Sequence, residues 1–294
     1  MNKLKTSFSI TLLLTLASCQ KLDEFDLKPD TCQLTKLSVE LDEEQQSLAG
    51  YYRNTEYFYN SEGLPEKVHS YSLFGELLFV TRYEYDSGLL EKEIKYDGAE
   101  DSQNIISVVE YQYEQELLKQ RESNTLKTVN GESKREFQLS YFRYENNIQV
   151  GSTSFSAGYS DLEFGSYNDS DLVLTHEIDY QWIPETNQLV EIWVDYVYSS
   201  DSSLIDTTKY WGETTKDFDG LFNPSSLNRL LAKSSGQPWL GFNTLSSRTK
   251  NSRGYTIWEY SYDQNYFPIE MKRTDYFRGE PGPIIRYIYN YDCD

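Results

Sequence analysis

The chain is poor in the residues that most often build metal and redox sites. Its 294 residues include two histidines, two methionines and three cysteines, and two histidines leave little room for a histidine-rich metal site. Positive charge is also scarce, with 27 Lys and Arg against 47 Asp and Glu, and this surplus of negative charge repels a nucleic-acid backbone. The sequence therefore predicts no metal, no cofactor and no nucleic-acid partner.

Long apolar runs are missing as well. Hydrophobic residues make up 38% of the chain and the mean hydropathy is −0.66, whereas a helical membrane protein needs runs of about 20 apolar residues. What the chain has in excess is tyrosine, with 26 residues beside 14 Phe and 5 Trp. Because aromatic side chains bury much apolar area, we expect a folded protein despite the net charge of −20.

The first 18 residues have the features of an export signal. Lys3 and Lys5 precede a mostly apolar stretch at 8–17, which is too short to span a bilayer. The stretch ends in Leu16-Ala17-Ser18-Cys19, which resembles a bacterial lipobox. The resemblance implies that residues 1–18 are a cleaved lipoprotein signal peptide and that a lipid attaches the protein to a membrane at Cys19. The alternative is an ordinary signal peptide with a cysteine there by chance.

Residues 19–32 are expected to form an acidic tether. Residues 20–26 resemble the short acidic tract that directs Bacteroidota lipoproteins to the outer leaflet of the outer membrane, which implies a surface-exposed outer-membrane lipoprotein. The alternative is a solvated linker without such a role. Cys32 and Cys293 lie at the two ends of the remaining chain, where a disulfide would join the first and last strands of a closed sheet. Two unpaired buried thiols would give the same sequence.

Beyond residue 32 the hydropathy pattern has a period of two, which is typical of half-buried strands. One face of each strand is expected to carry the apolar set and the other face the polar set. The clearest apolar sets are Val109, Tyr111 and Tyr113; Ile192, Val194, Tyr196 and Tyr198; Trp258, Tyr260 and Tyr262; and Ile285, Tyr287, Tyr289 and Tyr291.

Turn residues separate these strands. Asn, Asp and Gly, which supply the positive φ angles of tight hairpins, cluster at 60–63, 86–88, 97–98, 130–131, 146–147 and 263–265. Because no helical period interrupts the hairpins before residue 225, we expect an all-β domain over residues 33–294. Its predicted architecture is an up-and-down antiparallel meander, curled into a water-soluble barrel or a barrel-like sheet.

An internal repeat supports this architecture. Residues 57–67, beginning Tyr-Phe-Tyr-Asn-Ser-Glu-Gly, reappear at 83–92 as Tyr-Glu-Tyr-Asp-Ser-Gly, and weaker copies lie at 111–119 and 260–270. The first three copies are spaced as expected for two strands of about ten residues with their turns. Each copy therefore reads as a strand end, a turn and a strand start.

Residues 217–252 interrupt the pattern and are expected to form a plug or a lid. Ser225 begins a possible short helix that would carry Leu227, Leu230 and Leu231. Aromatic residues surround this excursion and form the predicted ligand platform, on which a glycan or a small apolar ligand would stack: Trp211, Phe222, Trp239 and Phe242. The alternative is that the excursion fills the barrel as its own core.

Together these motifs resemble a large family of Bacteroidota lipoproteins of unknown function, described as having a porin-like antiparallel fold. The resemblance rests on the lipobox, on the Tyr-x-Tyr-Asp hairpins, and on Phe218-Asp219 and Asn223-Pro224 before the late repeat. A second resemblance is to the YD repeats of secreted toxins. The charged strand faces, such as Arg82, Glu84 and Asp86, or Glu91, Glu93 and Lys95, are expected to meet water, with Tyr, Leu and Ile facing inward.

No catalytic motif stands out. Gly151-Ser152-Thr153-Ser154-Phe155 comes nearest to a nucleophile elbow but lacks its second glycine, and His69 and His176 are expected to be solvated hairpin residues. Two groups of residues could ligate calcium, although neither completes an EF-hand loop: Asn168, Asp169 and Asp171, and Asp217 and Asp219.

The leading hypothesis is therefore a monomeric, lipid-anchored surface protein without catalytic activity, acting as a binding or envelope-structural module. One alternative is a carboxylate-dependent glycan hydrolase, which would need two inward carboxyl groups roughly 5–10 Å apart. Another is a carrier that holds a small apolar ligand in a tyrosine-lined cavity.

Overall fold

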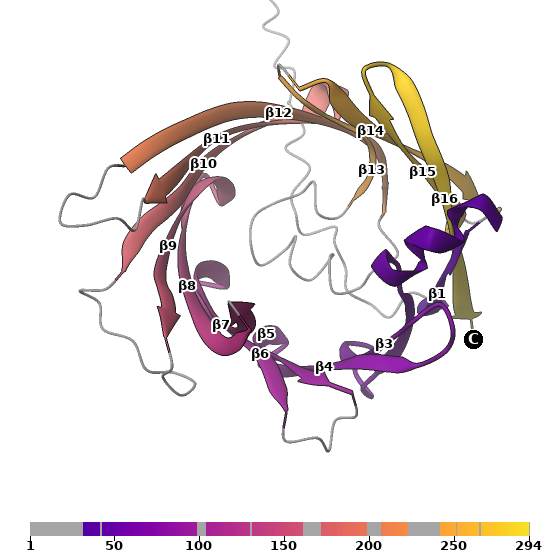
Figure 1. Ribbon diagram of the computed structural model, residues 1–294, viewed down its shortest axis with the longest axis horizontal. Coiled ribbons are helices and arrows are strands. Elements are labelled where there is room, and N and C mark those ends of the chain that lie inside the picture. The colour runs from indigo at the N-terminus through magenta and orange to yellow at the C-terminus, as the bar shows by residue number, and fades with distance from the viewer. Residues whose placement is uncertain are drawn as a thin grey trace, which may run out of the picture.

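Sixteen antiparallel strands form one closed barrel in the computed structural model (Figure 1). The structure describes residues 32–41, 43–98, 104–129, 131–160, 172–198, 207–222, 242–250, 252–264 and 266–293. Each strand pairs with its neighbours in sequence, and β16 closes the barrel against β1. The predicted all-β, up-and-down antiparallel barrel is therefore confirmed.

The first eight strands are β1 (Cys32–Glu40), β2 (Asn54–Tyr59), β3 (Pro65–Tyr71), β4 (Leu77–Asp86), β5 (Leu89–Asp97), β6 (Ile105–Glu114), β7 (Leu117–Val129) and β8 (Glu132–Glu145). The second eight are β9 (Ile148–Ser160), β10 (Val173–Ile183), β11 (Gln188–Tyr198), β12 (Thr207–Phe222), β13 (Phe242–Thr249), β14 (Gly254–Tyr262), β15 (Pro268–Phe277) and β16 (Glu280–Cys293). Two short 3-10 helices, η2 (Glu43–Tyr51) and η4 (Pro184–Thr186), are also present. In the described part of the chain, no helix is long and apolar enough to cross a membrane.

The flanks of the expected excursion belong to the sheet. Strand β12 continues to Phe222 and β13 begins at Phe242, where these two residues pair. The expected helix after Ser225 lies outside the described residues.

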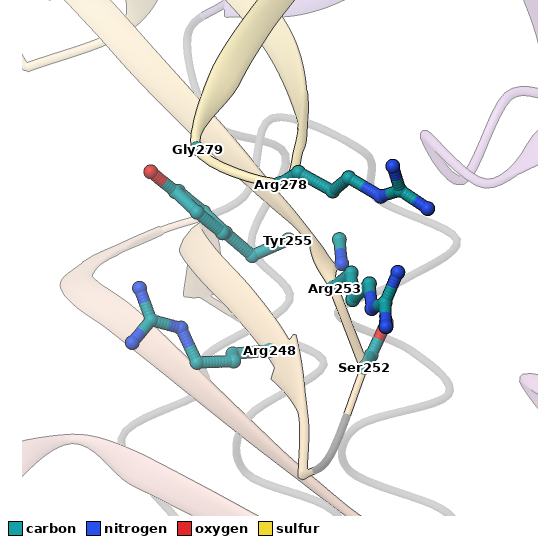
Figure 2. Close-up of a pocket in the computed structure, with 7 residues that line it drawn as sticks. Arg248, Ser252, Arg253, Tyr255, Arg278 and Gly279 are labelled. Atoms are coloured by element: carbon teal, nitrogen blue, oxygen red, sulfur yellow. The ribbon is translucent and has the colours of Figure 1, made fainter.

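The barrel has two distinct ends. Cys32 and Cys293 lie at one end, which we call the terminal end, together with the turns that follow the even-numbered strands. The turns that follow the odd-numbered strands lie at the other end, which we call the distal end. The β15–β16 hairpin, for example, turns at the distal end through Arg278 and Gly279, both with positive φ (Figure 2).

The turn chemistry agrees with the sequence prediction. Ser87 and Gly88 form a two-residue turn in which both φ angles are positive, and Asn146 and Asn147 do the same in β8–β9. The Asn60 side chain accepts hydrogen bonds from two backbone amides of its own turn. Local turn preferences therefore set the hairpins at the positions where the sequence placed them.

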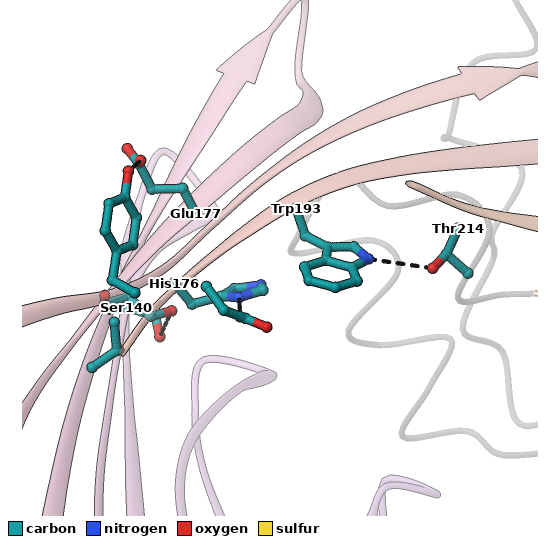
Figure 3. Close-up of polar contacts among 9 residues, drawn as sticks. Ser140, His176, Glu177, Trp193 and Thr214 are labelled. Carbon is teal, nitrogen blue, oxygen red and sulfur yellow. Dashed lines mark hydrogen bonds and ion pairs between the residues drawn. The ribbon is translucent and has the colours of Figure 1, made fainter. Parts of the chain in front are cut away.

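The strand register assigns each side chain to the inner or the outer face, because directly paired residues point to the same side of a sheet. Val109 and Tyr111 on β6 face inward, whereas Glu110 faces outward and pairs with Lys92. Figure 3 shows both directions on one strand, β10, where His176 points inward and the next residue, Glu177, points outward. The predicted inward face is confirmed for β6, β14 and β16. The prediction was wrong for β11, where Ile192, Val194 and Tyr196 face outward because the register places Asp195 inward, opposite His176.

Candidate functional site: the inner wall of the barrel

The inner wall carries a ladder of buried tyrosines near the terminal end. Five hydroxyl groups donate hydrogen bonds of 2.5–2.8 Å to backbone carbonyls on the strand before their own: Tyr59 to Leu34, Tyr85 to Pro65, Tyr113 to Leu90, Tyr144 to Leu118 and Tyr291 to Pro268. Burial raises the pKa of Tyr85 and Tyr144 above the ordinary phenol value, so both hydroxyls stay protonated donors at neutral pH. We call these five bonds the tyrosine ladder.

The ladder follows a row of β-bulges. Each acceptor residue lies beside a register shift and is paired there with a tyrosine of a neighbouring strand. Tyr85 is paired with Leu90 in this way, and Tyr113 with Leu118. A bulge interrupts the regular backbone pairing, and the tyrosine hydroxyl supplies a donor at that point. These tyrosines thus bind β2, β4, β6, β8 and β16 each to the strand before it.

A carboxyl group is buried beside this ladder. Glu93 on β5 lies opposite Tyr83 on β4 and Val109 on β6, and Tyr111 donates to it at 3.5 Å. Burial raises the pKa of Glu93, although the positive charges of Arg121 and Lys95 act against the rise. Glu93 is therefore an inward titratable group held between phenol rings.

The sequence placed Glu93 and Lys95 on the water-facing side, and this prediction was wrong. A bulge shifts the β4–β5 register, so that Tyr85 faces Leu90 while Glu84 faces Lys92. The extra residue reverses the alternation, and Glu93 and Lys95 then share the inner face with Tyr83. Arg82 and Glu84 point outward, as expected.

Replacing Glu93 with glutamine should stabilise the protein at pH 7. The folded-state pKa of Glu93 is raised, so the wild type loses stability as the pH rises through the unfolded value of 4.5 towards the folded value. Glutamine mimics the protonated form, and its advantage should vanish below about pH 4. Thermal melts at both pH values measure this. Glu110→Gln on the outer face is the matched control and should give no gain, whereas a Glu93→Gln protein less stable than wild type at pH 7 would refute the prediction.

A row of polar contacts crosses the inner wall from β8 to β13 (Figure 3). His176 Nδ1 lies 2.6 Å from Asp195 Oδ1, and Trp193 Nε1 donates to Thr214 Oγ1 at 3.4 Å. Gly212 is required beneath this tryptophan, because a Cβ there would lie 2.1 Å from the Trp193 ring. Both histidines lie on strands, and His176 is half-buried in this row.

Ser154, His176 and Asp195 lie side by side on three neighbouring strands, an order that resembles a hydrolytic triad. The Ser154 hydroxyl, however, bonds to Ser140 at 2.8 Å rather than to His176. A nucleophile must contact its base to be activated. These side-chain hydrogen bonds instead link β8 to β9 and β10 to β11.

The predicted aromatic platform is only partly described. Phe242 packs against Trp182, with ring centroids 6.2 Å apart, and both contact the cluster formed by Leu189 and Phe218 near the terminal end. Trp211 lies apart from this cluster: it is 68% exposed, pairs with Val194 and points outward. Trp239 lies outside the described residues, as does the side chain of Phe222. The structure thus separates Trp211 from Phe242 and joins Phe242 to Trp182, which sequence reasoning had not selected.

The cysteine and calcium candidates can be placed in part. Cys32 is disulfide-bonded, and Cys293 is the residue directly opposite it in the β1–β16 pairing. Cys19 lies outside the described residues, as do Asn168, Asp169 and Asp171.

The carboxylates of Asp217 and Asp219 already accept hydrogen bonds from protein donors. Gln188 and Ser246 donate to Asp217, while Asn243 and Tyr262 donate to Asp219. Among the residues that the structure describes, no group of three or more His, Cys, Asp or Glu side chains is arranged to hold a metal ion.

No protein-family model matches this sequence, and no curated protein matches it. Among solved structures, the chain is similar to the crystal structure of a porin-like protein from Bacteroides uniformis ATCC 8492, with a TM-score of 0.50 and 14% sequence identity. The match covers 90% of this chain and 100% of the other. At this identity the similarity concerns the fold, and it supports a porin-like β-barrel.

Proposed function

We propose that the protein is a lipid-anchored outer-membrane protein, exposed on the cell surface, whose barrel lies in water and acts as a non-catalytic binding or envelope-structural module. The observation that carries this proposal is the charge on the outer face. Ion pairs join neighbouring strands there: Lys36 with Glu56 at 3.1 Å, Lys92 with Glu110 at 2.7 Å, and Arg286 with Glu270 at 2.7 Å.

One outer ion pair crosses a whole strand. Arg143 on β8 reaches over Gly151 on β9 to Asp179 on β10, with 2.6 Å between Nη2 and Oδ1. A Cβ on Gly151 would lie 2.3 Å from the guanidinium, so glycine is needed for this passage. The outer wall is thus adapted to hold charges at its surface.

These charges argue against contact with lipid. Lys36 and Arg286 lie near the middle of their strands, and an arginine or lysine facing lipid at the bilayer midplane costs about 2–4 kcal/mol. In water, exposed pairs of this kind cost nothing and contribute up to about 1 kcal/mol each. A barrel tethered outside the bilayer by a lipid on Cys19 accommodates them.

Three inner carboxylates other than Glu93 favour a binding or structural role over the alternative hydrolase, because all three are already bonded to a basic side chain. Glu191 pairs with Lys216 at 2.7 Å, Asp195 with His176, and Asp275 with Arg273 at 3.0 Å. Glycoside hydrolysis needs one carboxyl group kept protonated and a second one free to attack or to activate water. Each of these carboxylates instead neutralises a neighbouring cation or bonds to it.

The proposal is tested by removing the lipid site. A Cys19→Ser chain expressed without its first 18 residues should be monomeric in detergent-free buffer, whereas the lipidated wild type should enter the detergent phase. Protease treatment of intact cells should then remove the wild-type protein from the surface. A lipid-free chain that aggregates without detergent but is monomeric in micelles would overturn the water-exposed barrel, and protection from protease would overturn surface exposure.

A further inference from the structure

Three arginines surround a pocket at the distal end of the barrel (Figure 2). Arg248 and Tyr255 come from strands β13 and β14, while Arg253 and Arg278 come from the turns β13–β14 and β15–β16. The pocket has a volume of about 500 Å³ and opens to solvent. Its position on two adjacent hairpins gives it walls of fixed geometry.

The backbone and the rings hold these arginines in place. The Arg278 amide donates to the Arg253 carbonyl at 2.6 Å, which joins the two turns. The Arg248 guanidinium lies 4.6 Å from the centre of the Tyr255 ring, and Tyr255 stacks on Tyr276 with centroids 4.6 Å apart. Stacking on a ring face leaves the guanidinium N–H donors free in their own plane.

Among the residues that the structure describes, no carboxylate compensates the positive charge of this pocket. No Asp or Glu is among the residues that line it, and within the described ranges no ion pair involves Arg248, Arg253 or Arg278. Most other cations of the outer wall have a carboxylate within 4 Å, in a chain with a net charge of −20. The guanidinium groups of Arg253 and Arg278 extend to the same side of the pocket (Figure 2) and repel one another unless an anion joins them.

We propose that this pocket binds a sulfate or phosphate ester carried by a saccharide-sized molecule. Guanidinium groups match the oxygen geometry of such esters and can donate two parallel hydrogen bonds to them. The pocket has a volume of about 500 Å³ and is open to solvent, so it has room for a group larger than one inorganic ion without enclosing it. The Tyr255 and Gly279 walls leave room for the sugar that carries the ester.

The position of the pocket favours a soluble or polysaccharide-borne ester over a lipid headgroup of the anchoring membrane. Strand β16 runs the full height of the barrel, from Glu280 beside the pocket to Cys293 at the terminal end. Its fourteen residues span about 45 Å along the strand. The proposed ligand class rests on the proposed function, because that function sets the orientation of the barrel.

Titration calorimetry of the lipid-free chain with sucrose octasulfate provides the test, with sucrose as the uncharged control. We expect binding that weakens with salt, a loss of tenfold or more in affinity in Arg253→Gln and in Arg278→Gln, and a change below twofold in Arg82→Gln. Arg82→Gln is the matched control, because this substitution removes the same charge from the outer wall at a position away from the pocket. Circular dichroism melts of all three variants check that each is folded.

Several outcomes would overturn the inference. Equal losses in Arg82→Gln and in the pocket variants would show that net charge, and not the pocket, attracts the sulfate ester. Inorganic phosphate that binds as tightly as sucrose octasulfate would exclude a saccharide-sized ligand, and binding only to phosphatidylglycerol vesicles would assign the pocket to a membrane. Failure of any binding would remove the ligand class while leaving the location of the barrel, tested separately by fractionation, unaffected.

Discussion

Replacing Cys32 with serine should lower the free energy of unfolding by about 5 kcal/mol, the largest effect we expect from a single substitution. Cys32 is disulfide-bonded, and its neighbour across the β1–β16 pairing is Cys293. A bond between these two residues encloses nearly the whole barrel sequence. In the chain-entropy model, a loop of this length restricts the unfolded state strongly and thereby favours the folded state.

Guanidinium chloride unfolding of the lipid-free chain measures the effect. Cys293→Ser should cause the same loss as Cys32→Ser, and the double variant should lose no more than either single one. A reductant should weaken the wild type and leave all variants unchanged. If Cys293→Ser were as stable as the wild type, the predicted pairing would be wrong.

Replacing Leu90 with alanine should lower the free energy of unfolding by about 2–5 kcal/mol. Leu90 is 0% exposed and packs with Leu64 against three tyrosine rings of the inner wall, those of Tyr83, Tyr85 and Tyr111. The hydroxyl groups of Tyr85 and Tyr111 are hydrogen-bonded, so these rings cannot collapse fully into the space that the leucine leaves. The lost packing is therefore expected to remain as a cavity.

Equilibrium denaturation again provides the measurement, with Ile284→Ala as the matched control. Ile284 lies on the outer face and is 47% exposed, so its truncation should cost about 1 kcal/mol or less. A Leu90→Ala variant no less stable than Ile284→Ala would show that Leu64, Leu90 and the tyrosine rings around them do not form a packed core.

The sequence predicts the architecture well because a meander depends on local information. Alternation and turn residues act within about ten positions, and each strand of this barrel pairs with its sequence neighbours. The alternation predicts the wrong face of a strand where pairing with a neighbouring strand decides which side chains point inward. On β5 a bulge reverses the faces, and on β11 the exposed Ile192 points outward while Glu191 and Asp195 face inward. The inner wall tolerates these acids because Lys216 and His176, on neighbouring strands, bond to Glu191 and Asp195.

The arginine pocket was not predicted, because its residues lie far apart in sequence. Arg253 and Arg278 become neighbours only when two turns at the same end of the barrel lie side by side. The available signal was the dipeptide Arg-Gly, which occurs at both of these turns in a strongly acidic chain. The aromatic platform failed to include Trp182 for a similar reason: the sheet brings it to Phe242 from 60 positions away.

The tyrosine ladder makes the hairpin, rather than the whole barrel, the unit of construction. Each rung reaches back only to the preceding hairpin, and Tyr291 and Tyr59 repeat the same bond on the two sides of the seam. Within strands β2 to β8, copying or deleting one hairpin would therefore leave every remaining phenol of the ladder with an acceptor. Such a barrel can gain or lose two strands at a time during evolution while its inner wall keeps the same pattern of hydrogen bonds.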